Sequence, residues 1–120
     1  MNRHVAASTP TLEEIAARLA EFARERDWDQ FHSPKNLAMA LAGEVGELLE
    51  HFQWLTETQS RELPPEVSDA VALEMADVLL YLVRLADQLG IDLAAAAERK
   101  IGLNAAKYPA DAVRGIARKY

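Results

Sequence analysis

Residues 65–90 read PEVSDAVALEMADVLLYLVRLADQLG, and this stretch decides the fold class. Its apolar residues recur at the three- and four-residue spacing of an amphipathic helix, without the alternation that marks a strand. Pro65 suits the first position of a helix, and Gly90 suits the position just past its end. The pattern therefore predicts one long helix from Pro65 to Gly90.

The rest of the chain follows the same pattern on either side of this helix. Further helices are predicted over residues 12–26, 34–55 and 93–108, and a polar loop over residues 56–64. Each of the three helices follows a side chain that can cap its first backbone N–H groups: Thr11, Ser33 and Asp92. No stretch alternates as a strand does, so we expect an all-α fold, a helical bundle.

Length and composition narrow the range of functions. The chain has 120 residues, enough for one domain over residues 1–120, in which we expect residues 1–10 to be flexible. It has no cysteine, which excludes disulfides and thiolate metal sites, and a net charge of −6, which argues against binding to a nucleic-acid polymer. No apolar run reaches the ~20 residues of a membrane span. We expect a cytoplasmic protein without a membrane partner.

Two pairs of carboxylates flank the apolar stripes of the two longest predicted helices. At about 100° per residue, Glu44 borders the stripe of its helix and Glu47 lies next to it. On the next long helix, with Val71 set to zero, the apolar stripe spans roughly −40° to +60°, and Glu74 and Asp77 lie near −60° and −120°. Four oxygen ligands on neighbouring helices suit Mg²⁺ or Mn²⁺. The alternative is that both pairs belong to ordinary solvated helix surfaces.

The last long helix carries a cationic face. Lys100, Asn104 and Lys107 share one side of it, where they would bind polyphosphate oxygens beside an acidic metal site. The alternative is that the lysines only extend toward water and complement the helix dipole.

Aromatic residues supply a third component. Trp54 is predicted on the flank of Glu47, about 10 Å further along the helix axis, and Trp28, Phe31 and His32 lie in a polar connection. Such rings can stack on a nucleobase, although packing at a hairpin corner explains them equally well. We interpret His51 as a surface partner of Glu47. Without a nucleophile motif or a phosphate-binding glycine loop, the sequence favours metal-assisted hydrolysis.

These motifs resemble those of a known family. The chain carries Glu44-x-x-Glu47 and Glu74-x-x-Asp77, together with RDWDQFH at 26–32, NLAMALAGEVGELLEHFQW at 36–54 and KIGLNAAKYP at 100–109. In this it is similar to the all-α nucleoside triphosphate pyrophosphohydrolases, often called MazG-like, and most of all to their dCTP pyrophosphatase branch. The similarity extends from about Thr11 to Tyr120.

The resemblance implies a nucleoside triphosphate diphosphatase that releases a monophosphate and pyrophosphate. It implies Mg²⁺, with Mn²⁺ possible, on Glu44, Glu47, Glu74 and Asp77. It also implies contacts to the base and sugar from Trp28, Asp29, Gln30, Phe31, His32, Trp54 and Tyr81. Phosphate-side contacts would come from Lys100, Asn104 and Lys107. The implied fold is a four-helix bundle completed by oligomerisation, with substrate near subunit interfaces.

Several hypotheses remain open at this point. The leading one is a house-cleaning hydrolase for dCTP or modified pyrimidine deoxynucleotides, in which Glu47 orients the attacking water. A dUTP or phosphoribosyl-ATP pyrophosphatase, a non-catalytic helical partner protein and a carboxylate metal-storage protein are the alternatives. The apolar face of the helix over 65–90 is wider than one neighbour can cover, which predicts a homo-oligomer, dimer or tetramer.

Overall fold

The computed structural model of the chain describes residues 9–117. Within this range every regular element is helical, and no strand is present, which confirms the all-α prediction. The elements are α1 (Leu12–Glu25), a single 3-10 turn η1 (Asp29–Phe31), α2 (Pro34–Glu50), α3 (Glu57–Arg61), α4 (Pro65–Gln88), α5 (Leu93–Lys107) and α6 (Ala110–Val113). None of the described helices is long and apolar enough to cross a membrane.

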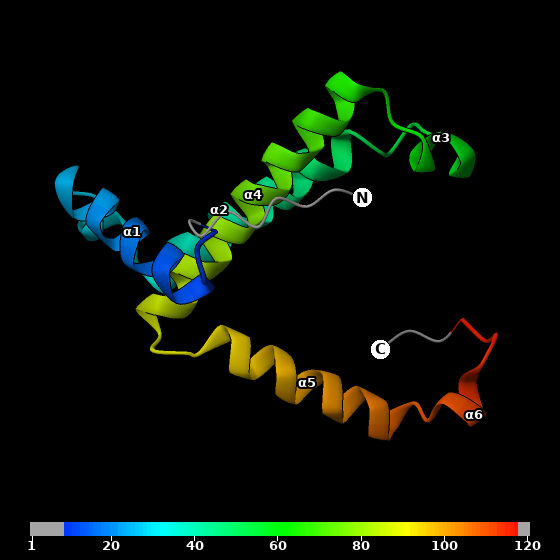
Figure 1. Ribbon diagram of the computed structural model, residues 1–120. Coiled ribbons are helices and arrows are strands. Elements are labelled where there is room, and N and C mark those ends of the chain that lie inside the picture. Colours follow the sequence, from blue (N-terminus) through cyan, green and yellow to red (C-terminus); the bar gives the residue numbers. More distant parts are fainter. Residues whose placement is uncertain (1–8, 118–120) are drawn as a thin grey trace.

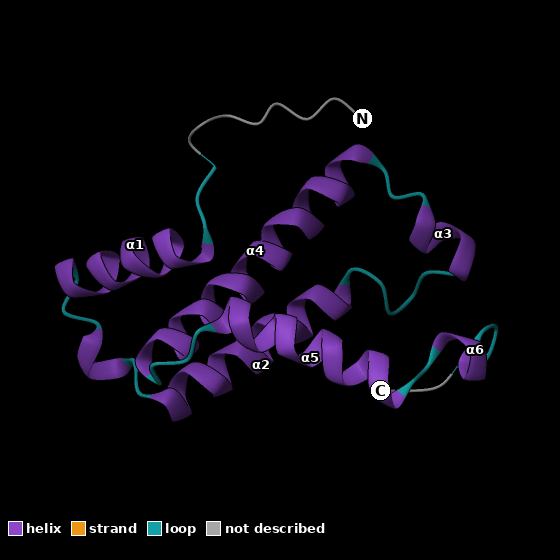
Figure 2. Cartoon of the chain, turned by 60° about the horizontal axis from the view of Figure 1, so that its bottom comes forward, coloured by secondary structure: helices purple, strands orange, loops and turns teal. Residues whose placement is uncertain are grey.

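Helices α2 and α4 form the centre of the molecule. They run antiparallel along most of their length, and α1 crosses α4 near its C-terminal end (Figure 1). After the turn at Gly90, α5 points away from the hairpin of α2 and α4 (Figure 1), and in a second view, where it passes across the hairpin, it runs toward α6 (Figure 2). The hairpin of α2 and α4, which holds most of the contacts between elements, is therefore the part on which a site can be built.

The core of the chain is small and lies where α1, α2 and α4 meet. Its buried apolar residues are Ala23, Leu37, Val71, Val83 and Ala86. Leu37 is 1% exposed, so it contributes about the 1.5–3 kcal/mol expected for a fully buried leucine. No residue of α5 is buried. The core of one chain is thus formed without α5.

The helix boundaries follow local capping chemistry. Thr11 and Glu14 form the predicted capping box, since the Thr11 hydroxyl accepts from the Glu14 N–H and the Glu14 carboxylate accepts from the Thr11 N–H, both at 3.1 Å. Ser33 and Asp92 cap α2 and α5 as predicted. Gly90 has a φ of +66°, a backbone conformation that favours glycine, directly after the end of α4.

Two predicted boundaries were wrong. Helix α2 ends at Glu50, not near residue 55, and residues 51–54 form turns. The carbonyl of Leu49 accepts from the N–H groups of both Phe52 and Gln53 at 2.9 Å, which tightens the chain out of the α-helix. The predicted loop over 56–64 contains α3, because Thr56 and Gln59 form a second capping box.

Helix α4 is apolar on two sides, but only one side is covered. Val83 is 3% exposed, buried by the chain itself, whereas Leu73, Met75 and Leu89 are each more than half exposed and Leu79 is 36% exposed. On α5, Ile101 is 70% exposed. These uncovered apolar faces agree with the predicted homo-oligomer without testing it.

Candidate active site

The antiparallel pairing of α2 and α4 brings three of the predicted carboxylates together. One oxygen each from Glu44, Glu74 and Asp77 lies within 4.8 Å of the others. Glu44 and Glu74 are half-buried against the hairpin, and Asp77 is exposed. The spacing of three residues between Glu74 and Asp77 places both on the same side of α4.

Glu47 lies one helical turn beyond Glu44 and joins this cluster. A hydrogen bond between their carboxyl groups, followed by burial and by the charges of Glu47, Asp77 and Glu74, raises the pKa of Glu44 from 4.5 to about 7. Burial is also the main cause that raises the pKa of Glu74, and the neighbouring His51 opposes that rise. The negative charges of the clustered carboxylates therefore repel one another, and a bound cation would reduce that repulsion.

The donor set of this cluster fits a divalent metal ion. The Oε2 atoms of Glu44 and Glu74 are buried and have no hydrogen-bond partner among the described residues. A buried carboxylate oxygen without a partner is costly, and an all-oxygen donor set suits Mg²⁺ or Mn²⁺. The geometry thus favours the metal hypothesis over an ordinary solvated surface.

The raised pKa of Glu44 predicts how the stability of the metal-free protein depends on pH. Because the folded pKa of about 7 exceeds 4.5, the stabilisation from the protonated form is fully present below about pH 4.5 and is lost as pH rises through 7. Melting curves should therefore show Mg²⁺ raising the Tm more at pH 8 than at pH 5.5. An equal Mg²⁺ effect at both pH values would contradict this coupling.

An aromatic cavity of about 190 Å³ adjoins the carboxylates. Asp77 belongs to both features, so the cavity opens beside the cluster. Trp28 meets Phe22 edge-on, with ring centroids 5.7 Å apart, and lies 6.2 Å from the His32 ring. The full lining consists of Leu19, Phe22, Trp28, His32, Leu37, Asp77, Leu80, Tyr81 and Arg84.

The cavity includes three of the predicted base-contacting residues, Trp28, His32 and Tyr81. The other members of the 29–32 segment do not line it. The side chain of Asp29 pairs with Arg84, and that of Gln30 donates to the carbonyl and carboxylate of Asp27, both at 3.0 Å. Phe31 is 58% exposed.

Trp54 does not occupy the position that the sequence argument gave it. Because α2 ends at Glu50, Trp54 lies in a turn beyond the helix, and the expected alignment with the flank of Glu47 was wrong. Its side chain is 85% exposed and lines neither the cavity nor the cluster. An indole this exposed is available to a ligand or to another subunit.

The predicted phosphate-side residues also lie outside the site of their own chain. Lys100, Asn104 and Lys107 are on α5, which Figure 1 shows pointing away from the hairpin. The ammonium group of Lys107 lies 5.3 Å from the centroid of the Tyr108 ring. In this arrangement α5 does not bring these three residues to the carboxylate cluster.

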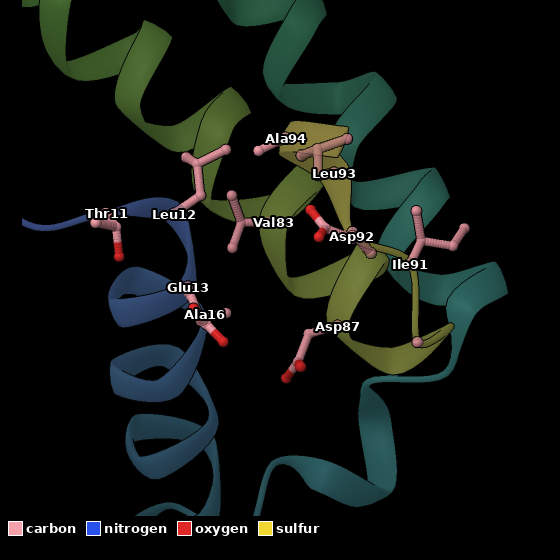
Figure 3. Close-up of a pocket in the computed structure, with 12 residues that line it drawn as sticks. Thr11, Leu12, Glu13, Ala16, Val83, Asp87, Ile91, Asp92, Leu93 and Ala94 are labelled. Carbon is pink, nitrogen blue, oxygen red and sulfur yellow. The ribbon is translucent and has the colours of Figure 1, made fainter. Parts of the chain in front are cut away.

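Sequence reasoning missed Arg84, the buried cation of the cavity. A signal was present, because Arg84 follows Asp77 by seven residues and Tyr81 by three, which puts all three on one face of α4. A larger cavity of about 490 Å³ lies between the start of α1 and the corner of α4 and α5 (Figure 3). It contains none of the clustered carboxylates, so we do not place the chemistry there.

Together these features define a class: an all-helical protein that gathers carboxylates from two antiparallel helices beside an aromatic cavity. Residues 40–120 match the MazG-like family, so the chain belongs to that family. This confirms the resemblance seen in the sequence.

Named relatives and a solved structure agree. The chain is 50% identical to dCTP pyrophosphatase 1 of Mus musculus and 49% identical to that of Homo sapiens. Each alignment spans 113 residues and covers 92% of this chain. The chain spans 66% of the length of these relatives. A pyrophosphatase from Archaeoglobus fulgidus superposes with a TM-score of 0.77 at 38% identity, over 91% of this chain and 98% of that one.

Proposed function

We propose that this chain is a Mg²⁺-dependent nucleoside triphosphate pyrophosphohydrolase of nucleotide-pool house-cleaning. Its substrate would be dCTP or a modified pyrimidine deoxynucleotide, and its products the monophosphate and pyrophosphate. The observation that carries the proposal is the cluster of Glu44, Glu74 and Asp77, with two orphaned buried oxygens, directly beside an aromatic cavity. The relatives are named dCTP pyrophosphatase 1, and that name supports cytosine as the base of the proposed substrate.

Glu44, Glu74, Asp77 and Glu47 would hold the metal ion. A bound divalent cation neutralises negative charge on phosphate oxygens and on the departing pyrophosphate. Glu47 is more exposed than Glu44 and lies outside the closest trio, which supports its assignment as the residue that orients the attacking water.

The remaining predicted contacts divide between two copies of the chain. Trp28, His32 and Tyr81 would contact the base within one chain. Lys100, Asn104 and Lys107 would reach the phosphates from a second copy, because their helix extends away from its own hairpin. A homo-oligomer, dimer or tetramer, is therefore part of the proposal, and the cytoplasm remains the expected location.

Removing either tryptophan should weaken nucleotide binding. Trp28→Ala deletes a wall of the cavity, and Trp54→Ala deletes an exposed ring that is free to stack. One base–aromatic stack is worth about 1–3 kcal/mol, so we expect KM to rise about 5- to 150-fold in each variant. Steady-state kinetics with dCTP checks this. An unchanged KM for Trp54→Ala would remove that residue from the site.

The substrate is tested by a screen for pyrophosphate release. Wild-type protein with Mg²⁺ is incubated with dCTP, 5-methyl-dCTP, dUTP, dTTP, the purine deoxynucleotides and phosphoribosyl-ATP. We expect the highest kcat/KM for the cytosine nucleotides. A preference for dUTP or phosphoribosyl-ATP would favour the alternative enzymes of this superfamily, and no turnover of any nucleotide would favour a non-catalytic helical protein.

A further inference from the structure

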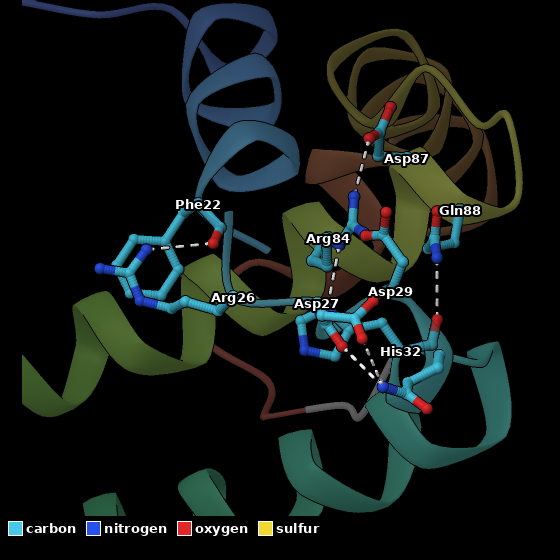
Figure 4. A network of polar contacts seen from close by, with 9 residues as sticks. Phe22, Arg26, Asp27, Asp29, His32, Arg84, Asp87 and Gln88 are labelled. Carbon is cyan, nitrogen blue, oxygen red and sulfur yellow. Dashed lines mark hydrogen bonds and ion pairs between the residues drawn. The ribbon is translucent and has the colours of Figure 1, made fainter. Parts of the chain in front are cut away.

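A buried arginine lies at the wall of the aromatic cavity, outside the carboxylate cluster. Arg84 is 6% exposed, and a guanidinium in such a place needs partners because its loss of hydration is costly. Its Nη2 donates to the Asp29 carboxylate at 2.9 Å, and its Nη1 lies 3.5 Å from the Asp87 carboxylate (Figure 4). These two carboxylates balance its charge.

The third contact of Arg84 is to a neutral acceptor. Its Nε donates to Nδ1 of His32 at 3.2 Å (Figure 4). A guanidinium stays protonated and has no acceptor atom, so Nδ1 must carry the lone pair. The neutral His32 ring then carries its hydrogen on Nε2.

The surroundings of His32 favour this neutral form. Burial and then the charge of Arg84 lower the pKa of the imidazole, and Asp29 offsets part of that effect. The Gln88 side chain donates to the His32 carbonyl at 2.8 Å, so α4 also holds the backbone at this point. The ring is thus fixed in its tautomer by Arg84 and in its position by α4.

His32 is part of the wall of the aromatic cavity. His32 lines the same cavity as Trp28, Tyr81 and Asp77. Among the described residues, its Nε2–H has no hydrogen-bond partner. A polar donor in a largely apolar pocket is the type of group that orients a ligand there.

We propose that Arg84 is a positioning residue, which fixes His32 as the Nε2–H tautomer so that the ring donates a hydrogen bond to an acceptor on the bound base. This rests on the proposed function, which makes the cavity a base pocket. The matching ligand chemistry is a pyrimidine that presents a carbonyl oxygen or an unprotonated ring nitrogen. A ring N–H at that position would face a second donor and be rejected.

The tautomer can be read directly from the metal-free protein at pH 7. Histidine side-chain ¹H–¹⁵N correlation spectra of the full chain should show His32 with an unprotonated Nδ1 and a protonated Nε2, assigned by comparison with His32→Gln. In Arg84→Met this pattern should give way to a mixture of forms. The matched control, Arg61→Met, changes an exposed arginine and should leave it unchanged. A protonated Nδ1 in the wild type would overturn the inference.

Kinetics test whether the tautomer matters for the base. Losing one neutral hydrogen bond should raise the KM for dCTP about three- to tenfold in Arg84→Met, with kcat within twofold of the wild type. His32→Gln removes the imidazole that Arg84 holds, so this variant should itself bind dCTP more weakly than the wild type. Adding Arg84→Met to that variant should then have no further effect.

The outcomes separate the two proposals. Equal KM increases from Arg84→Met with and without His32→Gln would mean that Arg84 only braces the fold, and an unchanged KM would also overturn the inference. If Arg84→Met fails to fold, Arg84→Gln, which keeps an amide donor, should restore both the fold and the wild-type KM. A wild type that hydrolyses no nucleotide would instead defeat the proposed function, while the spectra still decide the tautomer.

Discussion

Glu44→Gln should abolish nucleotide hydrolysis and leave the helical content unchanged. The substitution keeps the shape of the side chain and removes one charge from the cluster, where the buried Oε2 has no partner in the chain. Metal stabilisation of phosphoryl charge contributes several kcal/mol, so we expect kcat/KM to fall about a thousandfold. Asp77→Asn should behave similarly.

The same substitution should make the metal-free protein more resistant to heat at pH 8. Wild-type Glu44 has a pKa of about 7 because its neighbours oppose its charge, and glutamine avoids that repulsion. The matched control is Glu66→Gln, which removes an exposed carboxylate at the start of α4 and should keep full activity. Substantial hydrolysis by Glu44→Gln would contradict the assigned role of this residue.

Leu79→Glu should reduce both the oligomer mass and the activity. Leu79 is 36% exposed on a face of α4 that the chain itself leaves uncovered, and a charge there opposes burial against a second copy. Activity should fall at least tenfold if Lys100 and Lys107 reach the phosphates from that copy. Light scattering at micromolar concentration and dCTP hydrolysis measure the two effects.

One further substitution on α4 and one on α1 serve as comparisons for Leu79→Glu. Val83→Glu, which the sequence alone would place at the same interface, should instead unfold the chain, because Val83 is 3% exposed within the monomer. Ala17→Glu adds a charge on the exposed surface of α1 and should alter neither mass nor activity. A fully active wild-type particle of about 13 kDa would contradict the shared site.

Local chemistry made much of the fold predictable. The starts of α1, α2 and α5 depend on a single cap residue each, and the end of α4 depends on Gly90. The end of α2 was missed because the apolar pattern continues through Phe52, while the hydrogen bonds to the Leu49 carbonyl and the capping box at Thr56 act against it. The spacing of apolar residues alone does not show that local turn and capping hydrogen bonds compete with continuation of the helix.

The carboxylate cluster could be predicted from the sequence, whereas the contact between Arg84 and His32 in the cavity could not. Acids spaced by three residues lie on one side of their own helix, and their positions beside the apolar stripes predicted that Glu44, Glu74 and Asp77 would lie near one another on paired helices. The contact between Arg84 and His32 joins residues 52 positions apart, and its orientation depends on how α1 crosses α4. The direction of α5 was not predictable either, because no residue of this helix is buried in its own chain.

The central claim is that these carboxylates serve a metal-dependent attack that splits a nucleoside triphosphate into monophosphate and pyrophosphate. The most direct measurement is ³¹P NMR of dCTP incubated with wild-type protein, with Mg²⁺ and after full chelation of divalent ions. We predict signals of dCMP and pyrophosphate only, and no turnover after chelation. Formation of dCDP and inorganic phosphate, or hydrolysis that persists without divalent ions, would contradict the account.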